Sequence, residues 1–306
     1  MNKLIVIVGP TASGKTDLSV KIAKEFNGEC INSDSTQIFK GTDIATNKIT
    51  KEEMDGIEHH LLSIKEVNES YSVADFQKEA REKVAQILEK GKTPIIVGGT
   101  GLYTNALLMD YNFTSDDHIK DYEKQYEKLS NQEVWEILNE KDNLEAQKIH
   151  PNNRYRAIRA LEIIELNGNQ KSELIKDNKK YVYNNLLIVG LFPQRDKLYS
   201  RINNRVLSLE KRGLFKEIEM AYEANNFNKK AQSLKCIGGP EIIKYLEKEI
   251  TYDECIELMQ KNNRHYARRQ LTWFRNQLDN VEWFEHDYDN FNKISDEIIE
   301  YIKLNI

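Results

Sequence analysis

Residues 5 to 16 read IVIVGPTASGKT, an apolar run followed by a loop that fits the pattern G-x-x-x-x-G-K-[ST]. In loops of this kind the backbone N–H groups and the N-terminus of the following helix face an anion, and the lysine adds a positive charge. The Thr16 hydroxyl is a candidate ligand for Mg²⁺. The stretch therefore predicts a strand, a phosphate-binding loop and a helix, in that order. The predicted loop consists of Gly9, Pro10, Thr11, Ala12, Ser13, Gly14, Lys15 and Thr16.

The loop pattern is typical of nucleotide- and ATP-binding proteins, but it does not by itself say which phosphate compound is bound. An ordinary ATPase or GTPase holds Mg²⁺ with an Asp at the end of another apolar strand. Here the apolar runs at 93–99 and 186–192 lead into Thr100 and Pro193 instead. The one well-placed carboxylate is Asp34, at the edge where open α/β sheets bind their ligands. A turn cap within NSDST is the alternative role for Asp34.

Along the chain, short apolar runs alternate with longer amphipathic stretches, which is typical of strands and helices in a mostly parallel sheet. From about residue 115 to 185 the strand signals vanish and the sequence becomes charged and helical. After residue 192 the sequence reads as helical to Ile306. Strands are predicted at 4–8, 28–33, 60–64, 93–99 and 186–192, and helices at 16–26 and 73–90.

We predict an α/β fold in which a P-loop-type parallel sheet is flanked by helices and carries a helical insertion domain. The core domain, with its C-terminal helices, comprises residues 1–112 and 186–306, and the insertion domain comprises 113–185. A chain of 306 residues is long enough for one large domain or two of ordinary size.

Composition limits the partners and the compartment. The net charge of −5 argues against general attraction to nucleic acid, so a nucleic-acid partner needs a local basic patch. Three widely spaced cysteines favour neither a disulfide framework nor a C-x-x-C metal site, and they indicate a reducing cytoplasm. The apolar run at 4–8 is too short for a secretory signal or a membrane span, so we expect no membrane partner. His59 and His60 are adjacent, so in a strand they cannot both face one metal ion.

Two segments are locally basic. Between Met259 and Leu278 there is no Asp or Glu, and the basic residues fall on one arc of a helix beside an apolar arc. A helix face that carries only positive charges is suited to bind the phosphates of a nucleic acid. The alternative is that this face is only solvated, although solvated helix faces normally carry charges of both signs. In NRYRAIR (153–159), Arg156 and Arg159 lie about one turn apart. The residues of the first basic arc are Lys261, Arg264, His265, Arg268, Arg269 and Arg275.

Further motifs extend over nearly the whole chain. They are NSDSTQIFKGTDIATNK (32–48), HHLL (59–62), YSVADF (71–76), VGGTGLY (97–103), HPNNRYRAIRALE (150–162), RINNRV (201–206), CIGG (236–239) and RHYARRQLTWFR (264–275). Together with the loop, they resemble the bacterial tRNA dimethylallyltransferases, which transfer an isoprenoid group to an adenosine beside the anticodon. The sequence departs from that family at Gly239 and Pro240, where Tyr and Lys are usual, and at Ile49, where Pro is usual.

The resemblance implies that the loop binds the diphosphate of dimethylallyl diphosphate, with Mg²⁺ on Thr16 as cofactor. The exocyclic amine of adenine attacks the allylic C1 carbon and pyrophosphate leaves, so no Walker-B Asp is needed. Asp34 looks like the base that accepts the proton of the amine. Thr100 resembles the family's threonine beside the target nucleotide, and Arg205 its further cation on the leaving group. The alternatives are a helix cap for Thr100 and a solvated helix arginine for Arg205.

The implied partner is the anticodon stem-loop of tRNA, where extruding a base is least costly because the loop is single-stranded. We expect a cytoplasmic monomer. Two alternative functions stay open. One is a P-loop small-molecule or nucleoside kinase, which would transfer phosphate from ATP, and the other is a nucleotide-switch binding module. Residues expected at the tRNA are Asp34, Ser35, Thr36, Gln37, Thr100, Lys120, Tyr155, Arg156, Ala157, Ile158, Arg159, Lys235, Cys236, Ile237, Gly238, Gly239, Pro240, Arg264, Arg268 and Arg275.

Overall fold

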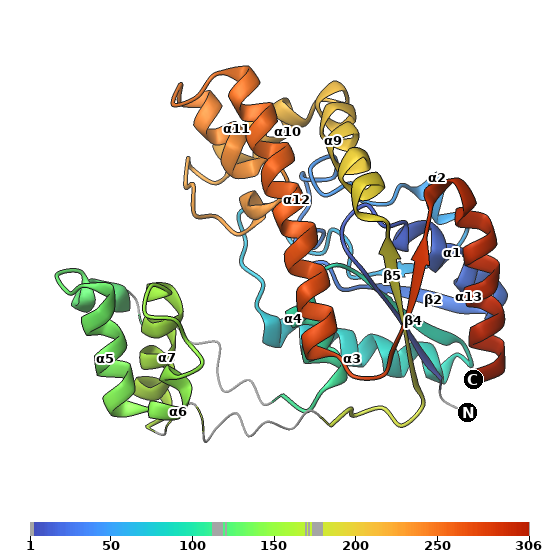
Figure 1. The fold of residues 1–306 in the computed structure, drawn as a ribbon, viewed down its shortest axis with the longest axis horizontal. Coiled ribbons are helices and arrows are strands. Elements are labelled where there is room, and N and C mark those ends of the chain that lie inside the picture. Colours follow the sequence, from blue (N-terminus) through green and yellow to red (C-terminus); the bar gives the residue numbers. More distant parts are fainter. Residues whose placement is uncertain are drawn as a thin grey trace. The chain divides into compact units, whose positions relative to one another are not determined.

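The computed structural model describes residues 3–111, 119, 121–168, 170, 172 and 180–305 (Figure 1). The chain divides into two compact units, one made of Met1–Leu108 and Tyr183–Ile306 and the other of Met109–Val182. The larger unit contains the sheet and the predicted phosphate loop, while the described elements of the smaller unit are all helices, with one isolated antiparallel bridge between Met109 and Tyr181.

The larger unit is built on a six-stranded sheet in the order β3-β2-β4-β1-β5-β6. Each strand runs parallel to its neighbours, so the carboxyl ends of all the strands lie at the same edge of the sheet. Helices flank this sheet, and the predicted α/β fold with a parallel sheet is confirmed. The strands are β1 (Leu4–Val8), β2 (Gly28–Asn32), β3 (His59–His60), β4 (Thr93–Val97), β5 (Leu186–Pro193) and β6 (Val281–His286).

The strand predicted at 60–64 is wrong in extent, because β3 contains only His59 and His60. The backbone leaves the extended region immediately after it, with φ of 60° at Leu61 and 51° at Ser63. The Leu61 carbonyl accepts a hydrogen bond from the Asn32 side chain instead of continuing the ladder. Residues 61–64 of the run HLLSI therefore leave the sheet as a bend beside β2.

The prediction of a helical sequence from 193 to Ile306 is also wrong, because β6 forms the edge of the sheet. It pairs with β5 in a register that sets Gly190 opposite Trp283. A Cβ at Gly190 would lie 2.4 Å from the Trp283 ring, so the glycine makes room for the indole. Two glutamates in VEWFEH weaken the local strand signal, and pairing with β5 supplies what the local sequence does not.

Helices cover the sheet on both faces, as Figure 1 shows. The long helix after β3 starts at a capping box formed by Ser72 and Asp75, and its residues Phe76 and Val84 are buried. The covering helices are α1 (Lys15–Glu25), α3 (Val73–Glu89), α4 (Gly101–Leu108) and α13 (Phe291–Asn305), with the short α2 (Lys51–Met54) between β2 and β3. No helix in the described ranges is both long enough and apolar enough to span a bilayer.

A second helical cluster in the larger unit follows β5. Its core includes Val206, Leu214, Ile242 and Met259. The elements are α9 (Arg195–Lys211), α10 (Leu214–Ala224), η2 (Ser233–Lys235), α11 (Gly239–Leu246) and α12 (Tyr252–Gln277), followed after β6 by η3 (Tyr288–Asn290). The long helix α12 packs along α9 and reaches back to α4, so it connects this cluster with the loops at the sheet edge.

The smaller unit has its own apolar core, which includes Tyr122, Val134, Leu138 and Leu161. Arg154 donates a hydrogen bond of 2.7 Å to the Leu129 carbonyl and so ties two of its helical segments. The described elements are η1 (Tyr122–Tyr126), α5 (Asn131–Lys141), α6 (Asn143–Ala146) and α7 (Arg154–Asn167).

Candidate active site

The phosphate loop connects β1 to α1 and has the backbone shape of an anion-binding loop. Gly9, Ala12 and Gly14 have φ of 152°, 64° and 90°, and only the glycines adopt such angles without steric cost. A Cβ on Gly9 would lie 2.8 Å from the Leu191 carbonyl oxygen of β5. The loop therefore fits closely over the sheet, and the predicted order of strand, loop and helix is present.

Two cations lie beside this loop. Lys15 Nζ donates to the Pro10 carbonyl at 2.8 Å, and Arg205 Nη1 donates to the Thr11 hydroxyl at 2.7 Å. Burial lowers the pKa of Lys15 to about 8 and that of Arg205 to about 10, in each case against the attraction of Asp34. Arg205 Nε is buried and has no partner among the described residues. Arg205 is thus a partly desolvated cation with a free donor, unlike a solvated helix arginine.

Asp34 caps a turn with one carboxylate oxygen and leaves the other oxygen without a partner among the described residues. Its Oδ1 accepts hydrogen bonds from the Thr36 N–H at 3.0 Å and the Thr36 hydroxyl at 2.7 Å, which holds the turn after β2. Oδ2 accepts no bond from a described residue and is free for a substrate proton or a cation. The negative charge of Asp34 acts to raise the pKa of both Lys15 and Arg205, against the effect of their burial.

Thr100 joins the loop after β4 to the loop after β2. Its hydroxyl accepts a hydrogen bond from the Ser35 N–H at 3.0 Å and lies 3.1 Å from the Ser35 hydroxyl. The Thr100 side chain therefore links two loops at the sheet edge. At the start of α4 it is the Thr100 carbonyl, not the hydroxyl, that accepts a hydrogen bond from the Thr104 N–H. Gln37, also expected at the RNA, donates to the Thr46 carbonyl at 3.1 Å and is only partly exposed.

Two further residues of this site come from α12 and were not singled out from the sequence. Gln270 accepts from the Thr11 N–H at 2.7 Å and donates to the Gly99 carbonyl at 2.9 Å, so it bridges the loops after β1 and β4. Burial raises the pKa of the Tyr266 phenol, and the Asp34 charge raises it further. The only sequence signal for either residue was its place within RHYARRQLTWFR.

The basic residues of α12 differ in how much they are free to meet a partner. Arg264 donates to the Asn203 side chain of α9 at 2.5 Å. The Arg275 guanidinium stacks 4.3 Å from the centroid of the Phe192 ring, although it remains exposed. Lys261, His265, Arg268 and Arg269 are exposed. The exposed basic residues thus lie on one helix, and Arg264 and Arg275 in addition make contacts with side chains of the same protein.

The tRNA-side residues expected in the smaller unit lie at the start of α7. Tyr155 is 77% exposed, and Arg156 is exposed as well. Ala157 is buried, and the partly buried Ile158 packs against the core of the unit. Arg159 pairs with the largely buried Glu162 at 2.6 Å. Lys120 lies outside the described residues.

The segment 235–240 connects η2 to α11. Lys235 and Pro240 are exposed, while Cys236, Gly238 and Gly239 are buried and Ile237 is partly buried. A Cβ at Gly239 would lie 2.0 Å from the Leu234 carbonyl oxygen, so no side chain fits there without moving the backbone. The tyrosine that the resemblance leads one to expect at this position is therefore incompatible with this loop conformation.

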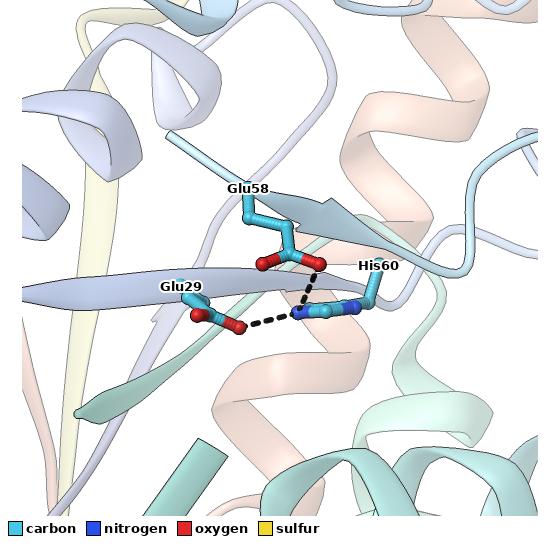
Figure 2. Close-up of side chains that lie close together, drawn as sticks. All are labelled: Glu29, Glu58 and His60. Carbon is cyan, nitrogen blue, oxygen red and sulfur yellow. Dashed lines mark hydrogen bonds and ion pairs between the residues drawn. The ribbon is translucent and has the colours of Figure 1, made fainter. Parts of the chain in front are cut away.

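A cluster of Glu29, Glu58 and His60 is the one group in the described part of the chain whose ligand atoms lie close enough together to hold a metal ion (Figure 2). Glu29 accepts from His60 Nε2 at 2.8 Å, but also from Lys90 at 2.9 Å and Lys92 at 2.8 Å. The ammonium groups of Lys90 and Lys92 already bind the buried Glu29 carboxylate, so the cluster is a structural ion-pair network. His59 bonds the Ile57 carbonyl instead, as adjacent strand residues must face apart.

Comparison with known proteins identifies relatives of this chain. The family model described as IPP transferase matches residues 37–277. A tRNA dimethylallyltransferase of Anoxybacillus flavithermus is 45% identical over 302 residues, covering 98% of this chain and 96% of the relative. The crystal structure of the full-length tRNA isopentenylpyrophosphate transferase from Bacillus halodurans is 43% identical, with a TM-score of 0.74 and coverage of 100% and 97%. A eukaryotic dimethylallyltransferase acting on tRNA is 28% identical, with a TM-score of 0.86 and coverage of 100% and 81%.

Proposed function

The chain belongs to the IPP transferase family, and we propose that it transfers the dimethylallyl group of dimethylallyl diphosphate to the exocyclic amine of an adenosine beside the anticodon of tRNA. The observation that carries this proposal is the meeting of a phosphate loop, two desolvated cations and one carboxylate at the sheet edge. Lys15 and Arg205 suit a diphosphate, and Asp34 suits an amine that gives up a proton next to it.

In the proposed reaction the amine nitrogen forms a bond to the allylic C1 carbon while the bond from C1 to the diphosphate oxygen breaks. The electron pair of that bond leaves with pyrophosphate, and the amine loses one proton. The amine is a poor nucleophile because its lone pair is delocalised into the ring, so a base that accepts the proton assists the attack. The free Oδ2 of Asp34 is the proposed acceptor.

The leaving diphosphate gains negative charge as the reaction proceeds, and preorganised donors stabilise that charge. We assign this role to the loop amides, to Lys15 and to Arg205. Mg²⁺ fits here, because Thr16 is exposed and Ser19 bonds to its carbonyl at 2.7 Å rather than to its hydroxyl. When bound there, Mg²⁺ would neutralise part of the diphosphate charge. Asp34 Oδ2 is a second oxygen that could serve the ion.

The proposed partner is the anticodon stem-loop of tRNA, with the basic face of α12 as the surface for its phosphates. The loops around Asp34 and Thr100, which Ser35 ties together, are the proposed place for the extruded adenine. We also propose that the protein acts as a cytoplasmic monomer.

The kinase alternative is not favoured, because the matched family and relatives are transferases that act on tRNA. Pyrophosphate release separates the two. With unmodified tRNA, dimethylallyl diphosphate and Mg²⁺ but no ATP, the protein should release pyrophosphate, and Lys15→Ala should abolish the release. Lys24→Ala, which removes an exposed lysine further along α1, should leave it unchanged. ATP hydrolysis that Lys15→Ala removes would support the kinase instead.

A further inference from the structure

In a trans peptide group the N–H of one residue and the carbonyl of the preceding residue point in opposite directions, so a phosphate-loop N–H can face an anion only when that carbonyl faces away from it. Two such carbonyls accept hydrogen bonds from distant side chains: Ser13 from His286 and Ala12 from Tyr288. His286 and Tyr288 lie 273 and 276 positions further along the chain than the residues they contact. The far side of the loop is thus held by the C-terminal segment.

The contact of His286 is well defined chemically. Its Nε2 lies 3.0 Å from the Ser13 carbonyl oxygen, and the residue is only 2% exposed. A carbonyl oxygen can only accept, so Nε2 carries the hydrogen. Burial lowers the pKa of His286, which favours a neutral imidazole with its proton on Nε2.

Tyr288 makes two contacts at once. Its hydroxyl donates to the Ala12 carbonyl at 2.9 Å, and its ring lies 4.4 Å from the Arg201 guanidinium. Ala12 is the loop residue with φ of 64°, a left-handed conformation that is sterically unfavourable for a non-glycine residue and needs support from its neighbours. Arg201 lies one turn before Arg205 on α9, so Tyr288 connects the loop to the helix that carries the second cation.

The sheet gives this segment a fixed position. His286 is the last residue of β6 and is paired with Pro193 of β5, and β5 is itself paired with β1, which leads into the loop. The rings of His286 and Tyr288 pack edge to face, with centroids 5.1 Å apart. A Cβ on Gly14 would lie 2.6 Å from the Phe291 ring, so the next residues of the segment also press on the loop. Figure 1 shows β6 beside β5 and α13 beside α1.

We propose that His286 and Tyr288 are positioning residues that hold the phosphate loop in its anion-binding shape and so set the affinity for the prenyl donor. This inference rests on the proposed function, because it takes the diphosphate of that donor as the bound anion. Neither residue contacts the reacting atoms; both act through the backbone of Ala12 and Ser13.

The test uses the full chain and two readouts. Tyr288→Phe removes one hydroxyl, His286→Leu removes the imidazole donor, and His286→Gln can restore an N–H donor at a similar position. Tyr301→Phe is the matched control, because Tyr301 packs against Phe284 of the same segment, with ring centroids 5.6 Å apart, and its hydroxyl donates no hydrogen bond to a described loop residue. Binding of inorganic pyrophosphate in the presence of Mg²⁺ is measured by calorimetry, and the KM values for donor and tRNA are measured in the transfer reaction.

Removing one hydrogen bond to the loop should weaken pyrophosphate binding and raise the donor KM by about five- to tenfold. The tRNA KM and the control variant should stay within about twofold, and His286→Gln should recover most of the affinity. Unchanged pyrophosphate binding and donor KM in Tyr288→Phe would overturn the inference, as would an equal rise in both KM values. If His286→Leu does not fold, Tyr288→Phe and His286→Gln still decide. A wild-type protein without prenyl transfer would instead refute the proposed function.

Discussion

Asp34 is held by one carboxylate oxygen, which accepts two hydrogen bonds from Thr36, while its other oxygen accepts no bond from a described residue. Asp34→Asn keeps the size and can retain the bonds to the turn, but it cannot accept a proton. We expect kcat to fall by about 10²–10⁴-fold, with little change in the affinities for donor and tRNA. Steady-state kinetics and separate binding measurements would test this.

Two other outcomes for Asp34→Asn would change its role. Weaker donor binding that extra Mg²⁺ partly restores would make Asp34 mainly a ligand of the ion. Near-normal turnover would show that Asp34 is not the base, and the departing pyrophosphate would become the next candidate for the proton.

The burial of Lys15 should make the affinity for the prenyl donor depend on pH. Because its pKa is lowered to about 8, the donor-free enzyme loses this charge as the pH rises through about 8, and donor affinity should then fall by up to about tenfold per pH unit. Titrations of the donor between pH 7 and 9.5 would measure it. Lys15→Arg, which stays charged, should give a flat profile, and a flat profile in the wild type would refute the assignment.

The sequence could predict the site residues that belong to local motifs, and it missed those that reach the site from far along the chain. The pattern around Lys15 and the position of Asp34 after a strand are local signals. Gln270 bonds to Thr11 across 259 positions, and no spacing in the sequence encodes that contact. Such long-range partners depend on how α12 packs, which periodicity does not specify.

At the scale of elements, α12 presents a basic face although the chain as a whole has a net charge of −5. Replacing Arg264, Arg268 and Arg275 by Ala should weaken tRNA binding and reduce its salt slope by about one unit for each phosphate that the variant no longer neutralises. The donor KM should hardly change. Filter binding at several salt concentrations would measure the slope.

Arg264 and Arg275 also make internal contacts, so Arg268→Ala alone is the cleanest variant for this test. Lys293→Ala is the charge-matched control, because Lys293 is 77% exposed on α13, outside the basic face. If the triple variant binds tRNA with unchanged affinity and salt slope, the face is only a solvated helix surface.

The edge of the sheet at β3 depends on Glu29. Burial by itself would raise its pKa, but hydrogen bonds from two lysines and an imidazole bring the pKa to about 2. A carboxylate with a lowered pKa stabilises the fold above its unfolded pKa of 4.5, and that stability is lost as the pH falls towards 2. Glu29→Gln should therefore lower the free energy of unfolding by about 2–3 kcal/mol at pH 7.

Urea denaturation at pH 7 and at successively lower pH would measure this loss, and the difference from wild type should shrink below pH 4.5. Glu58→Gln is the control, because the Glu58 side chain is 55% exposed and its pairs are longer. Equal stability of Glu29→Gln and wild type at pH 7 would show that the network contributes nothing.

The elements themselves were predictable where the local pattern and the tertiary environment agree. The apolar strands β1, β4 and β5 follow from their sequences, because buried parallel strands are mostly continuous apolar runs, whereas β2 is predicted although it contains Glu29 and Asn32. β6 contains two glutamates and needs β5 to pair with, so its local sequence did not indicate a strand. β3 ends early because the backbone at Leu61 turns left-handed, which an apolar run does not reveal.

At the scale of the whole molecule, an acidic protein is proposed to bind an acidic polymer, so its function depends on separating charges between surfaces. The net charge of −5 is distributed so that α12 presents one basic face, while Lys15 and Arg205 are kept at the phosphate loop. The smaller unit adds Tyr155 and Arg156 on an exposed helix start. The proposed reaction thus requires one chain to hold a diphosphate and an RNA loop at the same time.

The most direct test is to identify the product. Unmodified tRNA is incubated with the protein, dimethylallyl diphosphate and Mg²⁺ in the absence of ATP, and the nucleosides of the digested tRNA are analysed by mass spectrometry. The proposed function predicts a dimethylallyl group on the exocyclic amine of one adenosine beside the anticodon, with one pyrophosphate released for each group transferred and neither product with Lys15→Ala. Unmodified adenosine under these conditions would contradict it, and phosphate transfer to a small acceptor in a parallel reaction with ATP would favour the kinase instead.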